Sequence, residues 1–148
     1  MCGIICVVTR PSQRAVPDVA DLIGLLDESV VAATAGDFAL AAARMESVDT
    51  ALRGDVGQLV LAYNLELAAA IISRVDQLEA LAATTERSLE ALVGLSAAQM
   101  ERSNNELIAL RDASWSLRND RLRTARLVDA LAGKAAASSA RCAYYAIQ

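Results

Sequence analysis

Two long stretches of helically spaced apolar residues constrain the fold of this chain more than any other feature. The first starts at residue 55 and ends at Gly94, and the second runs from 96 to 133, so that the short Gly94–Leu95 turn joins them. Along each stretch the apolar residues recur every three or four positions, which places them on one face of an α-helix. Two long helices joined by so short a turn must lie antiparallel. The sequence therefore predicts a long helical hairpin.

Each stretch has one apolar face that we expect to be buried. In the first stretch this face consists of Val60, Tyr63, Leu67, Ile71, Val75, Leu78, Leu81, Leu89 and Leu92. In the second it consists of Met100, Leu107, Leu110, Ser114, Leu117, Arg121, Ala125, Val128 and Leu131. Trp115 stands beside this second face, and we expect it to anchor the packing.

The composition favours the same fold class. Of the 148 residues, 31 are alanine and only 3% are aromatic. Alanine is the best helix former because it loses no side-chain entropy when the chain is ordered. We therefore expect a mainly α protein, an antiparallel helical bundle built on the long hairpin.

Two shorter helices precede the hairpin. Asp18 can cap a helix over 19–34, and Asp37 can cap a second helix that ends near Arg53 and is followed by Gly54. Asp49 and Arg53 are spaced for an ion pair on the second helix. Because these helices are about half as long as the hairpin, we expect them to cover only part of it. The uncovered apolar surface predicts a homodimer.

Capping boxes are predicted at the starts of both long helices. Asp55 is followed three residues later by Gln58, and Ser96 is followed in the same way by Gln99. In such a box each side chain bonds to the backbone N–H of the other residue. We therefore expect one unbroken helix from Asp55 to Gly94 and another from Ser96 to Gly133.

The charge balance argues against nucleic acid as a partner. The net charge is −4, whereas nucleic-acid binders usually present a basic face. One arginine-rich stretch, 111–126, contains interleaved aspartates and no series of aromatic residues for stacking on bases. A solvated helix face with local ion pairs is the favoured interpretation.

Membrane insertion and export are also disfavoured. The most apolar stretch, Val56–Ser73, contains Glu66 near its centre, and a charge there is costly in a bilayer. The three cysteines, Cys2, Cys6 and Cys142, are too few and too widely spaced for a disulfide framework. We therefore expect a cytoplasmic protein without a membrane partner.

The only β-like segment is Cys-Gly-Ile-Ile-Cys-Val-Val at residues 2–8. A continuous apolar run with β-branched residues is typical of a strand that is buried on both faces. Such a strand needs neighbours, and the chain offers no second candidate. We therefore expect one short N-terminal β-strand that belongs to an incomplete α/β domain.

The absence of histidine limits the catalytic chemistry available. The chain has no histidine, which excludes Ser-His-Asp and Cys-His arrangements and the usual zinc and di-iron sites. We expect no metal and no cofactor. Cys2 is the one candidate nucleophile, because removal of Met1 would leave a free α-amino group on the same residue to accept the thiol proton.

The opening Met-Cys-Gly-Ile-Ile resembles the start of the class II, N-terminal-nucleophile glutamine amidotransferases, and is most similar to the glutamine:fructose-6-phosphate amidotransferase type. The resemblance implies that Cys2 attacks the side-chain amide of glutamine and forms a thioester. It also implies that the released ammonia passes to an aminosugar-type synthase domain. Only Cys2 and the adjacent Gly3 match the family's site. The glutamine-binding Arg and Asp and the Asn-Gly oxyanion pair have no counterparts, so the substrate-binding residues are unknown.

Two hypotheses follow for the whole chain. In the first, residues 1–11 are the nucleophile strand, 12–141 a helical insertion, and 142–148 the start of a helix that returns to the amidotransferase domain. These 148 residues would then be an N-terminal portion that is inactive alone. In the second, the chain is a non-enzymatic helical dimerisation or scaffold module. We favour the first, because the second leaves a strand buried on both faces unexplained.

Overall fold

The computed structural model describes residues 13–91 and 96–132, and every regular element in this region is a helix. In chain order they are α1 (Val19–Thr34), α2 (Phe38–Ala51), α3 (Gly54–Tyr63), α4 (Leu65–Ala91), α5 (Ala97–Trp115), the π-helical segment η1 (Ser116–Leu122) and α6 (Arg123–Ala132). The prediction of a mainly α bundle is confirmed. The predicted strand at 2–8 and the predicted helix at 142–148 lie outside the described residues.

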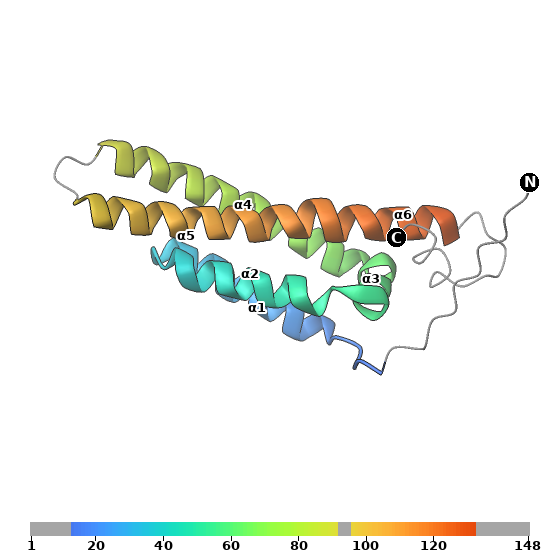
Figure 1. Cartoon of the computed structure of the whole chain (residues 1–148). Helices are drawn as coiled ribbons and strands as arrows, with labels where there is room; N and C mark the ends of the chain where they lie inside the picture. The colour runs from blue at the N-terminus through green and yellow to red at the C-terminus, as the bar shows by residue number, and fades with distance from the viewer. Residues whose placement is uncertain (1–12, 92–95, 133–148) are drawn as a thin grey trace, which may run out of the picture.

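The helices form two antiparallel hairpins packed side by side (Figure 1). One hairpin consists of α1 and α2, and the other of α4 and α5. The second hairpin is longer, because η1 and α6 continue α5 as a single rod whose far part packs against α3 (Figure 1). The predicted long hairpin is therefore confirmed, whereas its turn at 92–95 is not described. Helix α2 lies between α1 and α5 and runs in the same direction as α5.

Three of the predicted helix starts are confirmed by their caps. The carboxylate of Asp18 accepts from the backbone N–H of Ala20 at 2.8 Å, and that of Asp37 accepts from Leu40 at 2.9 Å. At α5 the capping box is complete, since Ser96 and Gln99 each accept from the backbone N–H of the other. Each cap satisfies backbone donors that have no partner within the helix.

The prediction of one unbroken helix from Asp55 to Gly94 is wrong. The chain turns by 95° between α3 and α4. Asn64 stands at the turn with a ψ angle of 93°, outside the helical range, and its side-chain oxygen accepts from the backbone N–H of Leu67 at 2.8 Å. Asn64 therefore caps α4. The bend also leaves Tyr63 64% exposed, although the apolar pattern had placed it in the core.

The predicted capping box of Asp55 and Gln58 is also wrong. Arg53 occupies the N-cap position of α3 and makes no side-chain cap. Gln58 is instead buried, and its Nε2 donates to the carbonyl oxygen of Leu52 at 3.1 Å. The same turn requires two glycines. Gly54 has a φ of +77°, and a Cβ on Gly57 would lie 2.5 Å from the Cα of Leu52.

The core is made by the apolar faces of the four long helices. The largest side chains with almost no exposure include Leu26, Met45, Leu67, Ile71, Leu78, Leu107, Leu110 and Leu117. Most of the predicted face positions are therefore confirmed, including Ser114, which is 1% exposed. Thin alanine side chains such as Ala41 and Ala82 fill the remaining space where helices approach each other.

Among the described helices, no single one has both the length and the apolar run that a membrane span needs. The bent pair α3 and α4 meets these requirements only when its two parts are taken together.

Candidate functional site

The sequence-predicted site residue, Cys2, lies outside the described residues, as do Cys6 and Cys142. The described residues carry two other features that could bind a partner, a groove and an exposed apolar ridge.

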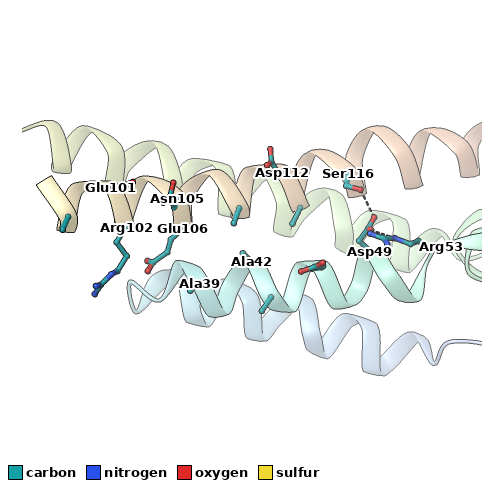
Figure 2. A pocket seen from close by; sticks show the side chains of 15 residues that line it. Ala39, Ala42, Asp49, Arg53, Glu101, Arg102, Asn105, Glu106, Asp112 and Ser116 are labelled. Carbon is teal, nitrogen blue, oxygen red and sulfur yellow. Dashed lines mark hydrogen bonds and ion pairs between the residues drawn. The ribbon is translucent and has the colours of Figure 1, made fainter.

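A groove of about 820 Å³ runs between the parallel helices α2 and α5 (Figure 2). Its floor is made largely of alanine: Ala39, Ala42 and Ala43 from α2, and Ala98, Ala109 and Ala113 from α5. Because these side chains are small, they do not fill the space between the two helices. The groove is therefore mostly apolar at its base.

The groove is lined by five carboxylates and only two guanidinium groups. Within residues 13–91 and 96–132, four of these carboxylates form no ion pair: Glu46, Glu101, Glu106 and Asp112. Several carboxylates elsewhere on the bundle are paired, although others, such as Glu66 and Glu90, are not. Asp27 is paired with Arg74 at 2.8 Å, and Glu86 with Arg111 at 2.5 Å. Arg102 also lines the groove and forms no ion pair among the described residues, so the four unpaired carboxylates leave the groove with a net negative charge.

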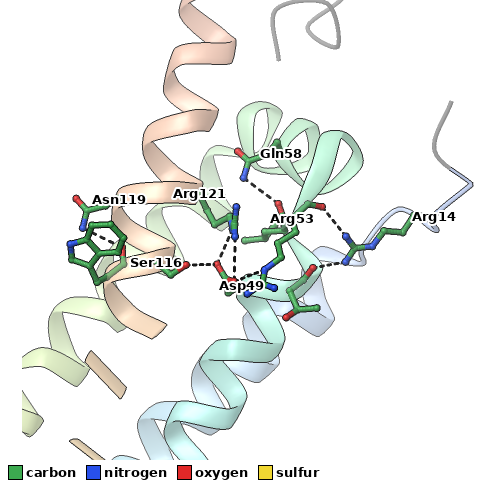
Figure 3. Close-up of polar contacts among 10 residues, drawn as sticks. Arg14, Asp49, Arg53, Gln58, Ser116, Asn119 and Arg121 are labelled. Atoms are coloured by element: carbon green, nitrogen blue, oxygen red, sulfur yellow. Dashed lines mark hydrogen bonds and ion pairs between the residues drawn. The ribbon is translucent and has the colours of Figure 1, made fainter. Parts of the chain in front are cut away.

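One end of the groove is closed by a polar cluster around Asp49 (Figure 3). Asp49 is 2% exposed. The Nε of Arg121 donates to its Oδ1 at 2.8 Å, the Nη2 of Arg53 lies 2.7 Å from Oδ2, and the hydroxyl of Ser116 donates to Oδ1 at 2.9 Å. The predicted Asp49–Arg53 pair is confirmed. The long-range partners Arg121 and Ser116 tie α2 to η1.

The Asp49 cluster holds a permanent charge. Burial on its own would raise the pKa of Asp49, but hydrogen bonds from Arg121, Arg53 and Ser116 lower it, and the net pKa lies below its ordinary value. Asp49 is therefore ionised near neutral pH. A general acid or base works best with a pKa near the operating pH, so this carboxylate is suited to anchoring rather than to proton transfer.

The π-helical geometry of η1 explains how Ser116 and Arg121 reach the same carboxylate. In an α-helix, residues five apart point about 140° away from each other, because each residue turns the helix by about 100°. A π-helix closes its hydrogen bonds from i to i+5, which brings such residues onto one face. The apolar spacing had predicted that Arg121 faces the bundle. The contact of Ser116 with Asp49 was not predicted, because nothing in the residue pattern indicates a π-helical segment.

Arg14 fastens the segment before α1 to the end of α2. Its Nη1 donates to the carbonyl oxygen of Arg53 at 2.8 Å, and its Nη2 donates to that of Thr50 at 2.5 Å (Figure 3). The last carbonyls of a helix have no partner within it and carry its negative dipole end, so a guanidinium suits this position.

A second exposed feature lies on the outer face of α5. Ile108 is 54% exposed, and Trp115, two helical turns further on, is 59% exposed. We refer to this pair as the Ile108–Trp115 ridge. The prediction that Trp115 anchors the core is wrong, since it lies about 100° around the helix from the buried Ser114. Trp is the residue most often found at the energetic centre of protein interfaces.

Catalytic or metal-binding groupings were sought in the same region. Residues 13–91 and 96–132 contain no group of three side chains that could hold a metal ion. Comparisons with protein-family models, with curated proteins and with solved structures return no match. The candidate sites are therefore two surfaces, the α2–α5 groove and the Ile108–Trp115 ridge.

Proposed function

We propose that the helical region is a non-enzymatic self-association module, in which two copies pair through the Ile108–Trp115 ridge. The observation that carries this proposal is the exposure of a large aromatic and a large aliphatic side chain on one face of a rigid helix. Contact between large apolar groups and water is unfavourable, and burying these groups against a partner lowers the free energy.

The sequence of α5 supports a two-fold arrangement of this ridge. If two α5 helices pair antiparallel about an axis at Ile108, Ile108 meets its own copy. In the same arrangement the amide of Asn104 faces the carboxylate of Asp112, and Trp115 faces the first turn around Glu101. A two-fold interface must be self-complementary in this way, because the same patch serves both copies. Asn104 and Asp112 are both exposed on the bundle and available for such a contact.

Sedimentation velocity at several protein concentrations tests the proposal. We expect a concentration-dependent monomer–dimer equilibrium, and we expect Ile108→Glu to raise its dissociation constant at least tenfold, because two like charges would meet at the axis. Leu65→Glu is the matched control. Leu65 is 83% exposed but lies on α4, so its replacement should leave the equilibrium unchanged. A monomer at several hundred micromolar, or equal effects of the two variants, would refute self-association through the ridge.

A second candidate function rests on the N-terminal segment. We propose that Cys2 serves as the nucleophile of a glutamine amidotransferase in which 12–141 are a helical insertion. Cys, Gly and Ile at positions 2–4, followed by β-branched residues, support it. An electrophilic glutamine analogue should label Cys2 in the native protein, and Cys2→Ser should abolish the labelling. Intact mass showing that Met1 is retained would overturn this candidate, because the α-amino group would then be blocked.

A further inference from the structure

We infer that the α2–α5 groove docks a cationic amphipathic helix of a partner protein, with small side chains on the face that enters the groove. The groove borders the Ile108–Trp115 ridge, and the proposed dimer contact shares Glu101 and Asp112 with its edge, but the inference does not depend on self-association. The shape of the groove, its charge and the pairing of this chain's own arginines support it.

The shape of the groove fits a helix. Its walls are two parallel helices, and the groove follows α2 from Ala39 to Arg53 and α5 from Ala98 to Ser116 (Figure 2). At 1.5 Å per residue these segments are roughly 21 and 27 Å long, which matches a docked helix of about 14–18 residues. A third helix packs into such a space by placing its side-chain ridge between the two walls.

The alanine floor determines which side chains the partner can present. Ala39, Ala43 and Ala109 are exposed, and none of them carries bulk beyond the Cβ. The backbone of a docked helix can therefore approach closely, provided that its own inward side chains are also small. Large inward side chains would keep the helix out of the groove and prevent its contacts with the charged residues that line the groove.

The negative charge of the groove determines that the partner helix is positively charged. Glu46 stands on the α2 wall, and Glu101, Glu106 and Asp112 belong to α5; none is paired within the described parts of the chain. The fifth carboxylate, Asp49, is already held by two arginines. Lysine or arginine side chains flanking the inward face of a docked helix would meet the four free carboxylates. Complementary charge of this kind raises association rates and rejects acidic partners.

Three paired arginines at the centre of this chain's long rod favour a foreign partner over a second copy as the occupant. On the rod from α5 to α6, Arg102, Arg123 and Arg126 form no ion pair among the described residues, but the three central arginines do: Arg111 with Glu86, Arg118 with Asp76, and Arg121 with Asp49. Moving these cations into the groove of another copy would break ion pairs that hold the bundle together. A partner helix with unpaired cations gains the groove contacts without that loss.

The probe for the test is an 18-residue synthetic helix with an alanine stripe on one face and lysines on both flanks, labelled for fluorescence anisotropy. The control peptide carries glutamate in place of every lysine. We expect saturable binding of the lysine peptide that weakens as salt is raised, and binding of the glutamate peptide that is at least tenfold weaker. No saturable binding of the lysine peptide up to about 1 mM, or equal binding of both peptides, would overturn the inference.

Charge-matched variants locate the binding. Glu46→Lys with Glu106→Lys should weaken binding of the lysine peptide at least tenfold. Glu66→Lys with Glu90→Lys changes the net charge equally on exposed positions of α4, outside the groove, and should alter binding less than twofold. Equal weakening by both pairs would show attraction to overall charge only and would overturn the assignment to the groove.

A floor-filling variant separates shape from charge. Ala109→Leu adds bulk at an exposed position without changing charge, and we expect it to weaken peptide binding at least fivefold while circular dichroism stays unchanged. Unaltered binding would contradict docking in the groove. Sedimentation distinguishes this outcome from failure of the proposed self-association. If the groove variants break the dimer and Ile108→Glu does not, the occupant is a second copy and the inferred partner class is wrong.

Discussion

The guanidinium of Arg121 donates from Nε to Oδ1 of Asp49 at 2.8 Å, although the two residues are 72 positions apart in the sequence. Arg121 is 19% exposed at its side chain and Asp49 3%, so the pair is largely removed from water. Two desolvated charges are tolerated only when each satisfies the other with good geometry. The pair therefore fixes η1 against α2 and sets the closed end of the α2–α5 groove.

Removing the carboxylate of Asp49 should destabilise the fold strongly. Asp49→Ala leaves the partly buried Arg121 without its partner, and we expect a loss of about 3–5 kcal/mol in the free energy of unfolding, measured by urea denaturation. Glu28→Ala is the control, because Glu28 pairs with Arg44 at 2.8 Å on the surface. Exposed pairs contribute about 0–1 kcal/mol. Similar losses for the two variants would show that burial does not strengthen the Asp49 contacts.

Asp49 should also make stability depend on pH in the acid range. Its pKa is lowered in the folded state by Arg121, Arg53 and Ser116 despite the opposing effect of burial. A carboxyl group with a depressed folded-state pKa stabilises the fold fully above its unfolded pKa of about 3.9. That contribution is lost as the pH falls through the folded-state pKa.

The measurement for this pH effect is the difference in unfolding free energy between the wild type and Asp49→Asn. We expect this difference to stay constant from about pH 7 to pH 5 and to shrink below about pH 4. A difference that grows on acidification would contradict a lowered pKa for Asp49.

Replacing Gly57 and replacing Gly24 by alanine should have opposite effects on stability. A Cβ on Gly57 would lie 2.5 Å from backbone atoms of Leu52, which cannot rotate away. We therefore expect Gly57→Ala to lower the melting temperature and to cost about 1–3 kcal/mol, as overpacking usually does. Gly24 in α1 has nothing within 4 Å of its Cβ position, so Gly24→Ala should stabilise the protein by about 0.5–1 kcal/mol. Destabilisation by both would contradict the packing at Gly57.

Much of this architecture could be predicted from local residue patterns. Caps such as Asp18 and Asp37 act on backbone groups two or three residues away, so a short stretch of sequence contains both partners. The apolar spacing that placed Leu107, Leu110 and Leu117 in the core has the same local character.

The bend at Asn64 could not be predicted from local residue patterns as the caps and the apolar faces could. The apolar spacing continues across it, so periodicity alone favours one helix. Asn64 has the chemistry of a cap, but asparagine also occurs inside helices, and the choice depends on where α3 packs. The tertiary contacts of α3 with α6 lie far away in the sequence.

The candidate surfaces were harder still to predict. The ridge depends on Ile108 and Trp115 lying on a face of α5 that the bundle leaves largely exposed, and residue spacing alone does not show which faces become covered. The groove needs the parallel approach of α2 and α5, and no local pattern specifies which helices become neighbours. The Asp49 cluster was hard to predict for both reasons. It depends on which helices become neighbours, and on a side-chain direction, since Ser116 reaches Asp49 only through the π-helical turn.

Asn64 itself gives a test of the bend. Its side-chain oxygen accepts from Leu67 N–H at 2.8 Å, so Asn64→Ala should cost about 1 kcal/mol in the free energy of unfolding. Asn64→Asp keeps an acceptor in the same place, and a negative charge at a helix N-terminus is favourable, so its stability should stay close to that of the wild type. An alanine variant as stable as the wild type would mean that α3 and α4 do not need this cap.

The single tryptophan of the chain allows the proposed self-association to be followed directly. Trp115 is 59% exposed in the isolated bundle, so its emission should be that of a water-exposed indole at low protein concentration. If two copies pair through the Ile108–Trp115 ridge, the indole loses water contact, and the emission should shift to shorter wavelength over the same concentration range in which sedimentation detects the dimer. Ile108→Glu should prevent the shift, whereas Leu65→Glu should preserve it. With tryptophan excited selectively, emission that stays constant while a dimer forms would place the interface elsewhere on the bundle, because Trp115 is the only tryptophan of the chain.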